Sequence, residues 1–202
     1  MLLALLTFCL VASITPGPNN MMLLSSGATY GFRRTVPHIF GISAGCGIMV
    51  LIVGLGLSGV AEYLPRFYTI LHVAATAYML WLAWRIATSA GPGQASAGGR
   101  PIGLLAAAAF QWVNPKAWAM VLGAVSSFAR PERMIGDVLL IAGVLVAVGL
   151  PCVTLWAGCG TLLQRLLDRP KALRAFNWSM AVLLVLSLVP GWQDLFAGAG
   201  QI

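Results

Sequence analysis

The sequence contains few charged residues. Only 8% of its 202 residues are Asp, Glu, Lys or Arg, whereas soluble domains carry about 25%. So few charges could not cover the surface of a water-soluble domain of this size. A disordered chain is excluded as well, because disordered chains are poor in apolar residues and 59% of this sequence is hydrophobic. The sequence therefore predicts an integral membrane protein.

Metal motifs and a signal-peptide pattern are also missing. The four cysteines all lie within apolar stretches, without C-x-x-C or zinc spacing: Cys9, Cys46, Cys152 and Cys159. We expect small, buried, reduced thiols and neither a metal nor a cofactor. No basic residue precedes Arg33, so the apolar start lacks the charged region of a signal peptide and is expected to be a retained first helix.

The apolar runs predict an all-α polytopic membrane protein. At about 20 residues per span, the chain has room for about six transmembrane helices. Strands are excluded because the runs are continuous and do not alternate in polarity. The expected spans are 2–26, 38–60, 66–89, 103–128, 137–163 and 173–192. The Gly/Ser-rich stretch 91–102 predicts a flexible linker that joins two halves, 1–90 and 103–202, of a single membrane domain, 1–202.

Basic residues in the short loops predict the orientation. The first, third and fifth loops with their helix edges hold Arg33, Arg34, Arg85, Arg100, Arg165, Arg169, Lys171 and Arg174, whereas the second and fourth hold Arg66, Arg130 and Arg133. The positive-inside rule then puts the odd loops in the cytoplasm and both termini outside. Because basic residues lie in the gaps between spans, the net charge of +7 does not indicate a nucleic-acid partner. Three spans per half give a 3+3 inverted repeat, a layout whose transporters bind substrate where paired helices are interrupted.

The first helix of each predicted half is interrupted by proline. Pro16, Pro18 and Pro115 lack an N–H, so the carbonyls of Ala12, Ile14 and Gln111 lose their usual helical donors. Free backbone groups are tolerated in a membrane only where protein or a water-filled cavity satisfies them. A half-helix that restarts after these prolines directs its N–H groups and positive dipole end at the gap, which suits a carboxylate. The candidate substrate-binding residues are Thr15, Pro16, Gly17, Pro18, Asn19, Asn20, Asn114, Pro115 and Lys116.

Lys116 is the only Lys or Arg well inside an expected span. A cation at the bilayer centre costs about 2.5–3.5 kcal/mol on insertion scales, so it calls for a reason. One hypothesis is that Lys116 binds a substrate carboxylate or gates by losing its proton. The other is that its ammonium only caps carbonyls freed by Pro115. No intramembrane acid is expected to pair with it, since Asp137 falls at a helix edge.

Four motifs in order resemble the LysE/RhtB family of amino-acid exporters. They are Thr15-Pro16-Gly17-Pro18-Asn19-Asn20, Tyr30-Gly31-Phe32-Arg33-Arg34, Ala77-Tyr78-Met79-Leu80-Trp81-Leu82-Ala83-Trp84-Arg85 and Asn114-Pro115-Lys116. The resemblance covers nearly the whole chain, and Ser25-Ser26 with Phe110-Gln111-Trp112-Val113-Asn114 is most similar to the cysteine/O-acetylserine branch.

This resemblance implies a multi-pass carrier of the bacterial inner membrane, embedded in lipid. It would export small neutral amino acids such as cysteine, O-acetylserine, threonine or homoserine by antiport with protons, as a homodimer. Several relatives carry an acidic residue in the fifth helix, whereas Ala147-Val148-Gly149-Leu150-Pro151-Cys152 has none. That difference argues against lysine or arginine as the substrate.

Two other function classes remain open from the sequence. A channel or a structural membrane partner needs no coupled transport, although a channel of this size would have to oligomerise. Gly41-Ile42-Ser43-Ala44-Gly45 matches the G-x-S-x-G pattern of serine hydrolases, but Gly41 and Gly45 more simply predict close helix packing. His38 and His72 are expected to be solvated at the membrane interfaces, and they join Lys116 and Asp137 as the candidates for a titrating group.

Overall fold

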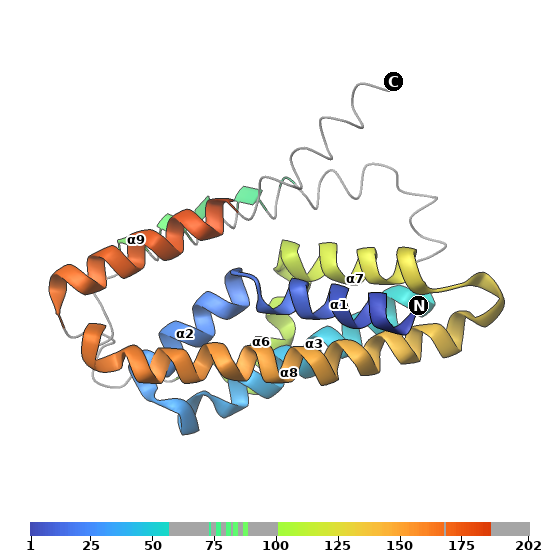
Figure 1. The fold of residues 1–202 in the computed structure, drawn as a ribbon, viewed down its shortest axis with the longest axis horizontal. Coiled ribbons are helices and arrows are strands. Elements are labelled where there is room, and N and C mark those ends of the chain that lie inside the picture. The colour runs from blue at the N-terminus through green and yellow to red at the C-terminus, as the bar shows by residue number, and fades with distance from the viewer. Residues whose placement is uncertain are drawn as a thin grey trace, which may run out of the picture.

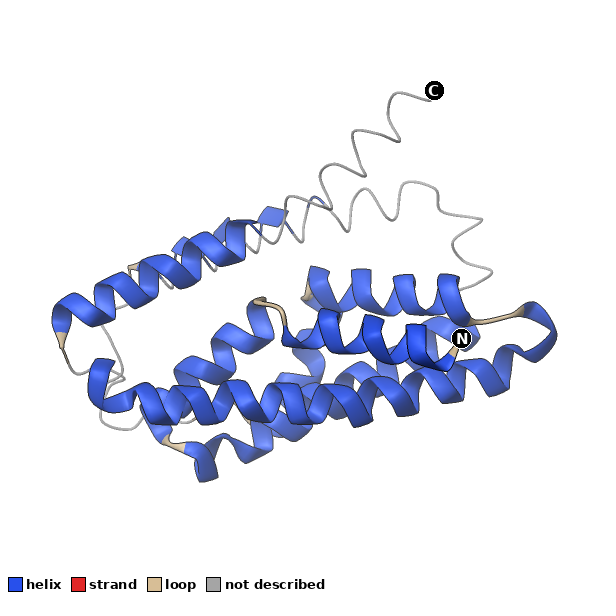
Figure 2. Cartoon of the chain, viewed as in Figure 1, coloured by secondary structure: helices blue, strands red, loops and turns tan. Residues whose placement is uncertain are grey.

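The computed structural model describes residues 1–56, scattered positions between 73 and 88, residues 101–167 and residues 169–186. All regular elements of these parts are helices, without a strand, which confirms the all-α class (Figure 2). They are α1 (Leu2–Ile14), α2 (Pro18–Tyr30), α3 (Phe32–Gly56), α6 (Leu104–Phe110), η2 (Gln111–Val113), α7 (Pro115–Phe128), η3 (Pro131–Arg133), α8 (Met134–Leu167) and α9 (Pro170–Leu186). Most of the expected span 66–89 and of the linker 91–102, together with His72, lies outside the described residues.

Some of these helices can cross a membrane. Within the described parts, α3 and the helical stretch Pro131–Leu163 are each long and apolar enough to do so. Helices α1 and α2 add a third crossing if they are taken as one span that bends by 53°. The number of spans, the inverted repeat and the side on which the termini lie stay predictions.

The junction between α2 and α3 is shorter than expected. The sequence favoured a loop at residues 31–34 and a second span from residue 38, but α3 begins at Phe32. Gly31 adopts a φ of 77°, the one positive φ among the described residues, so a single residue reverses the chain. The next residues can therefore form the first turn of α3. Helix α8 likewise extends beyond 137–163 at both ends, from Met134 to Leu167.

Helix α8 runs along the bundle beside α1, α2 and α3 (Figure 1). Gly47 of α3 packs against Val146 and Gly54 packs against Val138, so α3 and α8 are antiparallel. Helices α1 and α2 run in the same direction as α8. Ser13 of α1 lies opposite Gly149, and Leu24 and Gly27 of α2 meet Gly160 and Ala157, which both come later on α8.

Glycines on α3 bring α6 close to it, as the sequence predicted. A Cβ at Gly41 would meet the Leu104 carbonyl oxygen and Ala107, and one at Gly45 would lie 2.7 Å from Ala108 Cα. The later residue of α3 meets the later residue of α6, so α6 is parallel to α3. The broken helix α6–α7 therefore runs opposite to the broken helix α1–α2.

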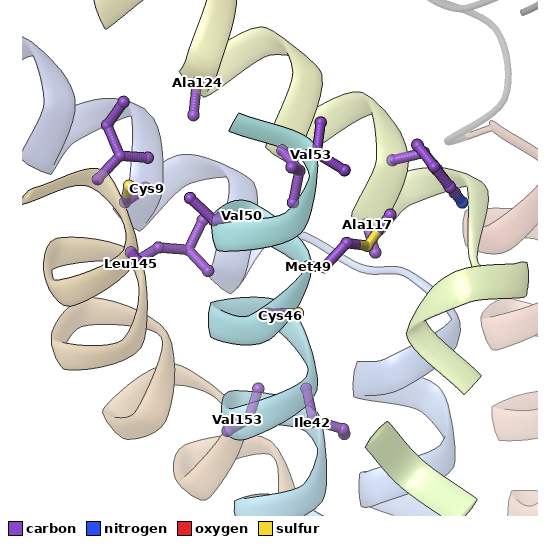
Figure 3. Packing of buried hydrophobic residues seen from close by; sticks show 14 of the residues in the cluster. Cys9, Ile42, Cys46, Met49, Val50, Val53, Ala117, Ala124, Leu145 and Val153 are labelled. Atoms are coloured by element: carbon purple, nitrogen blue, oxygen red, sulfur yellow. The ribbon is translucent and has the colours of Figure 1, made fainter. Parts of the chain in front are cut away.

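The core between these helices is apolar and closely packed. Side chains from α1, α3, α7 and α8 meet around Cys46 and Val50 of α3 (Figure 3). Cys9, Cys46 and Cys152 are buried and all four cysteines are free, although Cys159 is only partly buried. Large apolar side chains cover the outside of the helices, as a lipid-facing surface requires; they include Leu3, Phe40, Ile52, Leu105 and Leu162.

Candidate functional site

The two helix breaks lie next to each other in the bundle. In the first break, residues 15–17 separate α1 from α2, and Gly17 precedes Pro18, the first residue of α2, with extended backbone. In the second break, η2 and the extended residue Asn114 separate α6 from α7, which begins at Pro115. In both breaks a proline opens the following half-helix, the position where its missing N–H costs least.

The three carbonyls that the prolines release all have protein donors. The Ala12 carbonyl accepts from the Thr15 hydroxyl at 3.2 Å, the Ile14 carbonyl from the Trp156 indole N–H at 3.1 Å, and the Gln111 carbonyl from the Asn114 N–H at 3.2 Å. The protein itself therefore satisfies these groups of the break. Trp156, which lies on α8, was not among the candidates, because its partner is 142 residues away in sequence.

Lys116 joins the second break to the first. Its Nζ donates to the Thr15 carbonyl at 2.7 Å, to the Thr15 hydroxyl at 2.8 Å and to the Pro16 carbonyl at 3.0 Å. The capping hypothesis was thus wrong about the partner, because the ammonium caps the first break and not the carbonyl freed by Pro115. Gly17 makes room for the lysine: a Cβ at Gly17 would lie 2.6 Å from Lys116 Cδ and 3.1 Å from Nζ.

Two buried asparagines stabilise the breaks from within. Asn20 Nδ2 donates to the Ser13 and Thr15 carbonyls, both at 2.8 Å, so the second half-helix holds the end of the first. Asn114 Oδ1 accepts from the Lys116 backbone N–H at 3.1 Å and caps the start of α7. Both side chains are almost fully buried. Their first role in this conformation is therefore to satisfy backbone groups.

A pair of side-chain amides forms the second link between the breaks. Asn19 Nδ2 donates to Gln111 Oε1 at 2.8 Å, and Gln111 Nε2 donates back to Asn19 Oδ1 at 3.2 Å. Gln111 is fully buried and also donates to the Ala107 carbonyl at 2.8 Å, while its Oε1 accepts from the Cys46 thiol at 3.4 Å. Gln111 was not a candidate site residue, although a glutamine beside Asn114-Pro115 in an apolar run was a visible signal.

A cavity of about 50 Å³ lies between the two breaks, α3 and α8. This break pocket is lined by Ala12, Ser13, Gly17, Pro18, Asn19, Asn20, Ile42, Ser43, Cys46, Asn114, Lys116, Ala117, Met120, Leu145, Gly149 and Val153. Of the candidates, Thr15, Pro16 and Pro115 do not line it. The backbone N–H groups of Asn19 and Asn20, at the start of α2, have no acceptor among the described residues. The volume is enough for about three water molecules.

The sequence placed His38 wrongly at a solvated interface. Its side chain has no exposed surface, and neither ring nitrogen has a hydrogen-bond partner among the described residues. The error follows from the helix boundary, because α3 begins at Phe32 and carries His38 into the bundle. Ser43, by contrast, lines the break pocket and donates its hydroxyl to the Ile39 carbonyl at 3.1 Å.

Asp137 is held by Arg130 at the start of α8. Arg130 Nε lies 2.8 Å from Oδ2 and Nη2 lies 2.9 Å from Oδ1, and the Arg130 backbone N–H adds a third bond to Oδ2 at 3.2 Å. This bidentate pair spans the turn between α7 and α8. The carboxylate therefore stabilises a helix hairpin, away from the break pocket.

Comparison with known proteins gives a consistent result over almost the full length. Residues 10–187 match the family described as LysE type translocator. The chain is 36% identical to a cysteine/O-acetylserine efflux protein of Klebsiella pneumoniae over 190 residues, which is 92% of this chain and 94% of that protein. It is 35% identical to the protein of the same name from Escherichia coli K12 over 191 residues, or 94% and 96% of the two chains. No solved structure shows significant similarity to the chain.

Proposed function

The chain belongs to the LysE family of translocators, and from this membership and the break pocket we propose that it exports small neutral amino acids, cysteine or O-acetylserine foremost. It is a multi-pass transporter of the inner membrane and not an enzyme. The serine-hydrolase hypothesis for Ser43 therefore falls. The observation that carries the proposal is the meeting of two broken helices around one cavity, because transporters of this kind bind substrate where helices are interrupted.

The break pocket suits the carboxylate of an amino acid. The N–H groups of Asn19 and Asn20, which have no acceptor among the described residues, stand at the positive end of the α2 dipole, which favours an anion. Lys116 lines the same cavity and adds a positive charge. Among the other lining residues, Ser43 and Asn114 have oxygens that accept hydrogen bonds from the substrate ammonium. Thr15, Pro16 and Pro115 contribute by shaping the breaks and positioning Lys116.

We assign the transport cycle to alternating access. The halves 1–90 and 103–202 rock about the break pocket, so that it faces the cytoplasm and then the outside, and protons move in the opposite direction to the substrate. The same proposal includes six spans in an inverted repeat, with both termini on the outer side. It also includes a homodimer in the lipid. The breaks support it, because the hydrogen bonds that join α1–α2 to η2–α7 there, among the described residues, are all made by side chains, those of Lys116, Asn19 and Gln111.

Efflux from intact cells tests the export proposal. Cells preloaded with a panel of labelled amino acids are compared when they carry empty vector, wild type, Lys116→Ala or Lys171→Ala at matched expression. Lys171 is an exposed basic residue on α9 and controls for the loss of one positive charge. We expect wild type and Lys171→Ala to release one or two small zwitterions above the vector rate, and Lys116→Ala to reach the membrane but export poorly. Release at the vector rate by wild type would refute export. Equal export by Lys116→Ala would leave export standing and limit Lys116 to capping Thr15 and Pro16.

The channel alternative predicts a different flux. A channel only lets its substrate run downhill, whereas a coupled carrier saturates and can run uphill. Efflux that saturates and continues when the same amino acid is in excess outside the cells favours the carrier. Linear, purely downhill flux would favour the channel.

A further inference from the structure

A fully buried histidine lies one helical turn from the break pocket. His38 has no exposed surface, and neither Nδ1 nor Nε2 has a hydrogen-bond partner among the described residues. Buried polar side chains nearly always have partners, so an exception calls for an explanation. Ile42 and Ser43, on the next turn of α3, line the pocket. The orphaned imidazole is therefore close to the place where substrate is proposed to bind.

Polar side chains of α3 and α2 lead from the exposed end of α3 to His38. Arg33 is exposed in the first turn of the helix. The hydroxyls of Thr35 and Ser26, both buried, lie 3.0 Å apart one turn before His38. At 1.5 Å per residue, His38 stands about 6 Å before the first pocket residue of this helix. A proton that travels between the pocket and the Arg33 end therefore passes His38.

No described acid on the neighbouring helices is placed to balance a charged His38. The titratable and charged groups of these elements are Cys9 on α1, Tyr30 on α2, Arg33, Arg34 and Cys46 on α3 itself, Lys116 on α7, and Asp137, Cys152, Cys159 and Arg165 on α8; α6 and η2 carry none. Asp137 is bound to Arg130, and the next residue, Val138, packs against Gly54 at the opposite end of α3. Lys116 is bound to Thr15 and Pro16. An imidazolium would therefore be strongly disfavoured in this conformation, because no group among the described residues balances or solvates its charge.

We propose that His38 is the proton-carrying group of the transport cycle. The inference rests on the proposed export function and names the residue that couples it to protons. When the pocket opens outward and substrate leaves, water reaches the imidazole, which accepts a proton on its basic nitrogen. The empty pocket has room for about three water molecules, and widening it by one turn of α3 beyond Ile42 would let this water solvate the imidazolium on the return step. Opening toward the Arg33 end returns the proton to water, and substrate binds beside the neutral ring. Bound substrate displaces the water that would solvate the imidazolium, so substrate and proton exclude each other. Each proton that moves inward is therefore exchanged for one exported molecule.

Reconstituted protein separates coupling from binding. Wild type, His38→Gln and His72→Gln are placed in liposomes and tested with labelled O-acetylserine and cysteine in two assays. The first measures exchange of external label for unlabelled internal substrate at equal pH. The second measures accumulation when the lumen is about one pH unit more acidic than the outside, with the membrane potential set to zero by potassium and valinomycin. One proton exchanged per molecule supports up to about tenfold accumulation under this gradient.

We expect His38→Gln to keep exchange and to lose accumulation, while wild type and His72→Gln show both. The glutamine amide has similar polarity but does not titrate, so a purely structural role would leave accumulation intact. Accumulation by His38→Gln equal to wild type would overturn the inference, and so would loss of both exchange and accumulation in that variant. Wild type that exchanges without accumulating would overturn proton coupling at His38 while leaving amino-acid export intact. Wild type that does not exchange would refute the export proposal and this inference with it.

Discussion

Gly17→Ala perturbs the contact between Lys116 and the first break without removing a charge or a polar group. Gly17 has φ and ψ of −179° and 176°, an extended conformation that alanine adopts easily and that the residue before a proline favours. The new Cβ, however, would lie 2.6 Å from Lys116 Cδ and 3.1 Å from Nζ, so the lysine side chain has to move. Because its ammonium donates to Thr15 and Pro16, this movement breaks at least one of those hydrogen bonds.

The expected cost follows from that hydrogen bond. A hydrogen bond to a charged group contributes about 1.5–3 kcal/mol, and we take the lower end because Lys116 is only partly buried. Alanine restricts the unfolded chain and returns about 0.4–1 kcal/mol. Gly17→Ala should therefore destabilise the wild type by about 1 kcal/mol. In a Lys116→Ala background the obstacle is gone, and the same change should stabilise by about 0.4–1 kcal/mol. The coupling energy of the double-mutant cycle is then about 1.5 kcal/mol, within the range for residues in contact.

The assay is the free energy of unfolding of the four proteins in mixed detergent micelles. Gly103→Ala serves as the matched control, because Gly103 also precedes a half-helix with extended backbone but a Cβ there would meet no atom within 4 Å. We expect no coupling between Gly103→Ala and Lys116→Ala. An equal effect of Gly17→Ala in both backgrounds would show that Lys116 does not contact the first break as described. That result would refute the reasoning.

Two further predictions concern helix packing and the pocket. Gly160→Ala should destabilise the protein by about 1–3 kcal/mol, because its Cβ would meet the backbone carbonyl of Leu24, which cannot move aside. Gly158→Ala, which would meet no atom within 4 Å, should be neutral or stabilising in the same unfolding assay, and equal effects of the two would contradict close α2–α8 packing. In a variant that keeps Cys46 alone among the four cysteines, saturating O-acetylserine should slow the reaction of Cys46 with N-ethylmaleimide, because this thiol lines the break pocket. An unchanged labelling rate would argue against substrate in that pocket.

The breaks were predictable because their cause is local. Pro16, Pro18 and Pro115 lack an N–H wherever they stand, so their positions in apolar runs fix where a helix must be interrupted. The close packing at Gly41 and Gly45 was predictable for the same reason, since small residues one turn apart permit a near approach. These features need no knowledge of the neighbouring helix.

The partners in the site were not predictable, because they are remote in sequence. Lys116 lies 101 residues from Thr15, and Gln111 lies 92 residues from Asn19. The sequence therefore indicated that Lys116 needs acceptors, but the expected acceptors, the carbonyls freed by Pro115, are not the ones that it binds. The error at His38 has a different cause: a single glycine, Gly31, turns the chain where a four-residue loop was expected.

The contacts around the breaks are of two kinds, close backbone packing and side-chain hydrogen bonds, and the hydrogen bonds are the easier to break and replace. Helices α2 and α8 meet backbone to backbone at Gly160, α6 meets α3 in the same way at Gly41, and Arg130 with Asp137 joins α7 to α8 at the turn between them. The first two of these contacts join the proposed halves 1–90 and 103–202, so rocking of the halves would have to pivot about them. The links between the two breaks are instead side-chain hydrogen bonds, made by Lys116 and by the Asn19–Gln111 pair, and the same side chains, apart from Gln111, line the break pocket. Rocking of α6–α7 against α1–α2 would have to break these bonds. A carboxylate that draws the ammonium from Thr15 and Pro16 replaces one of them, so substrate binding and loosening of the breaks would be one event.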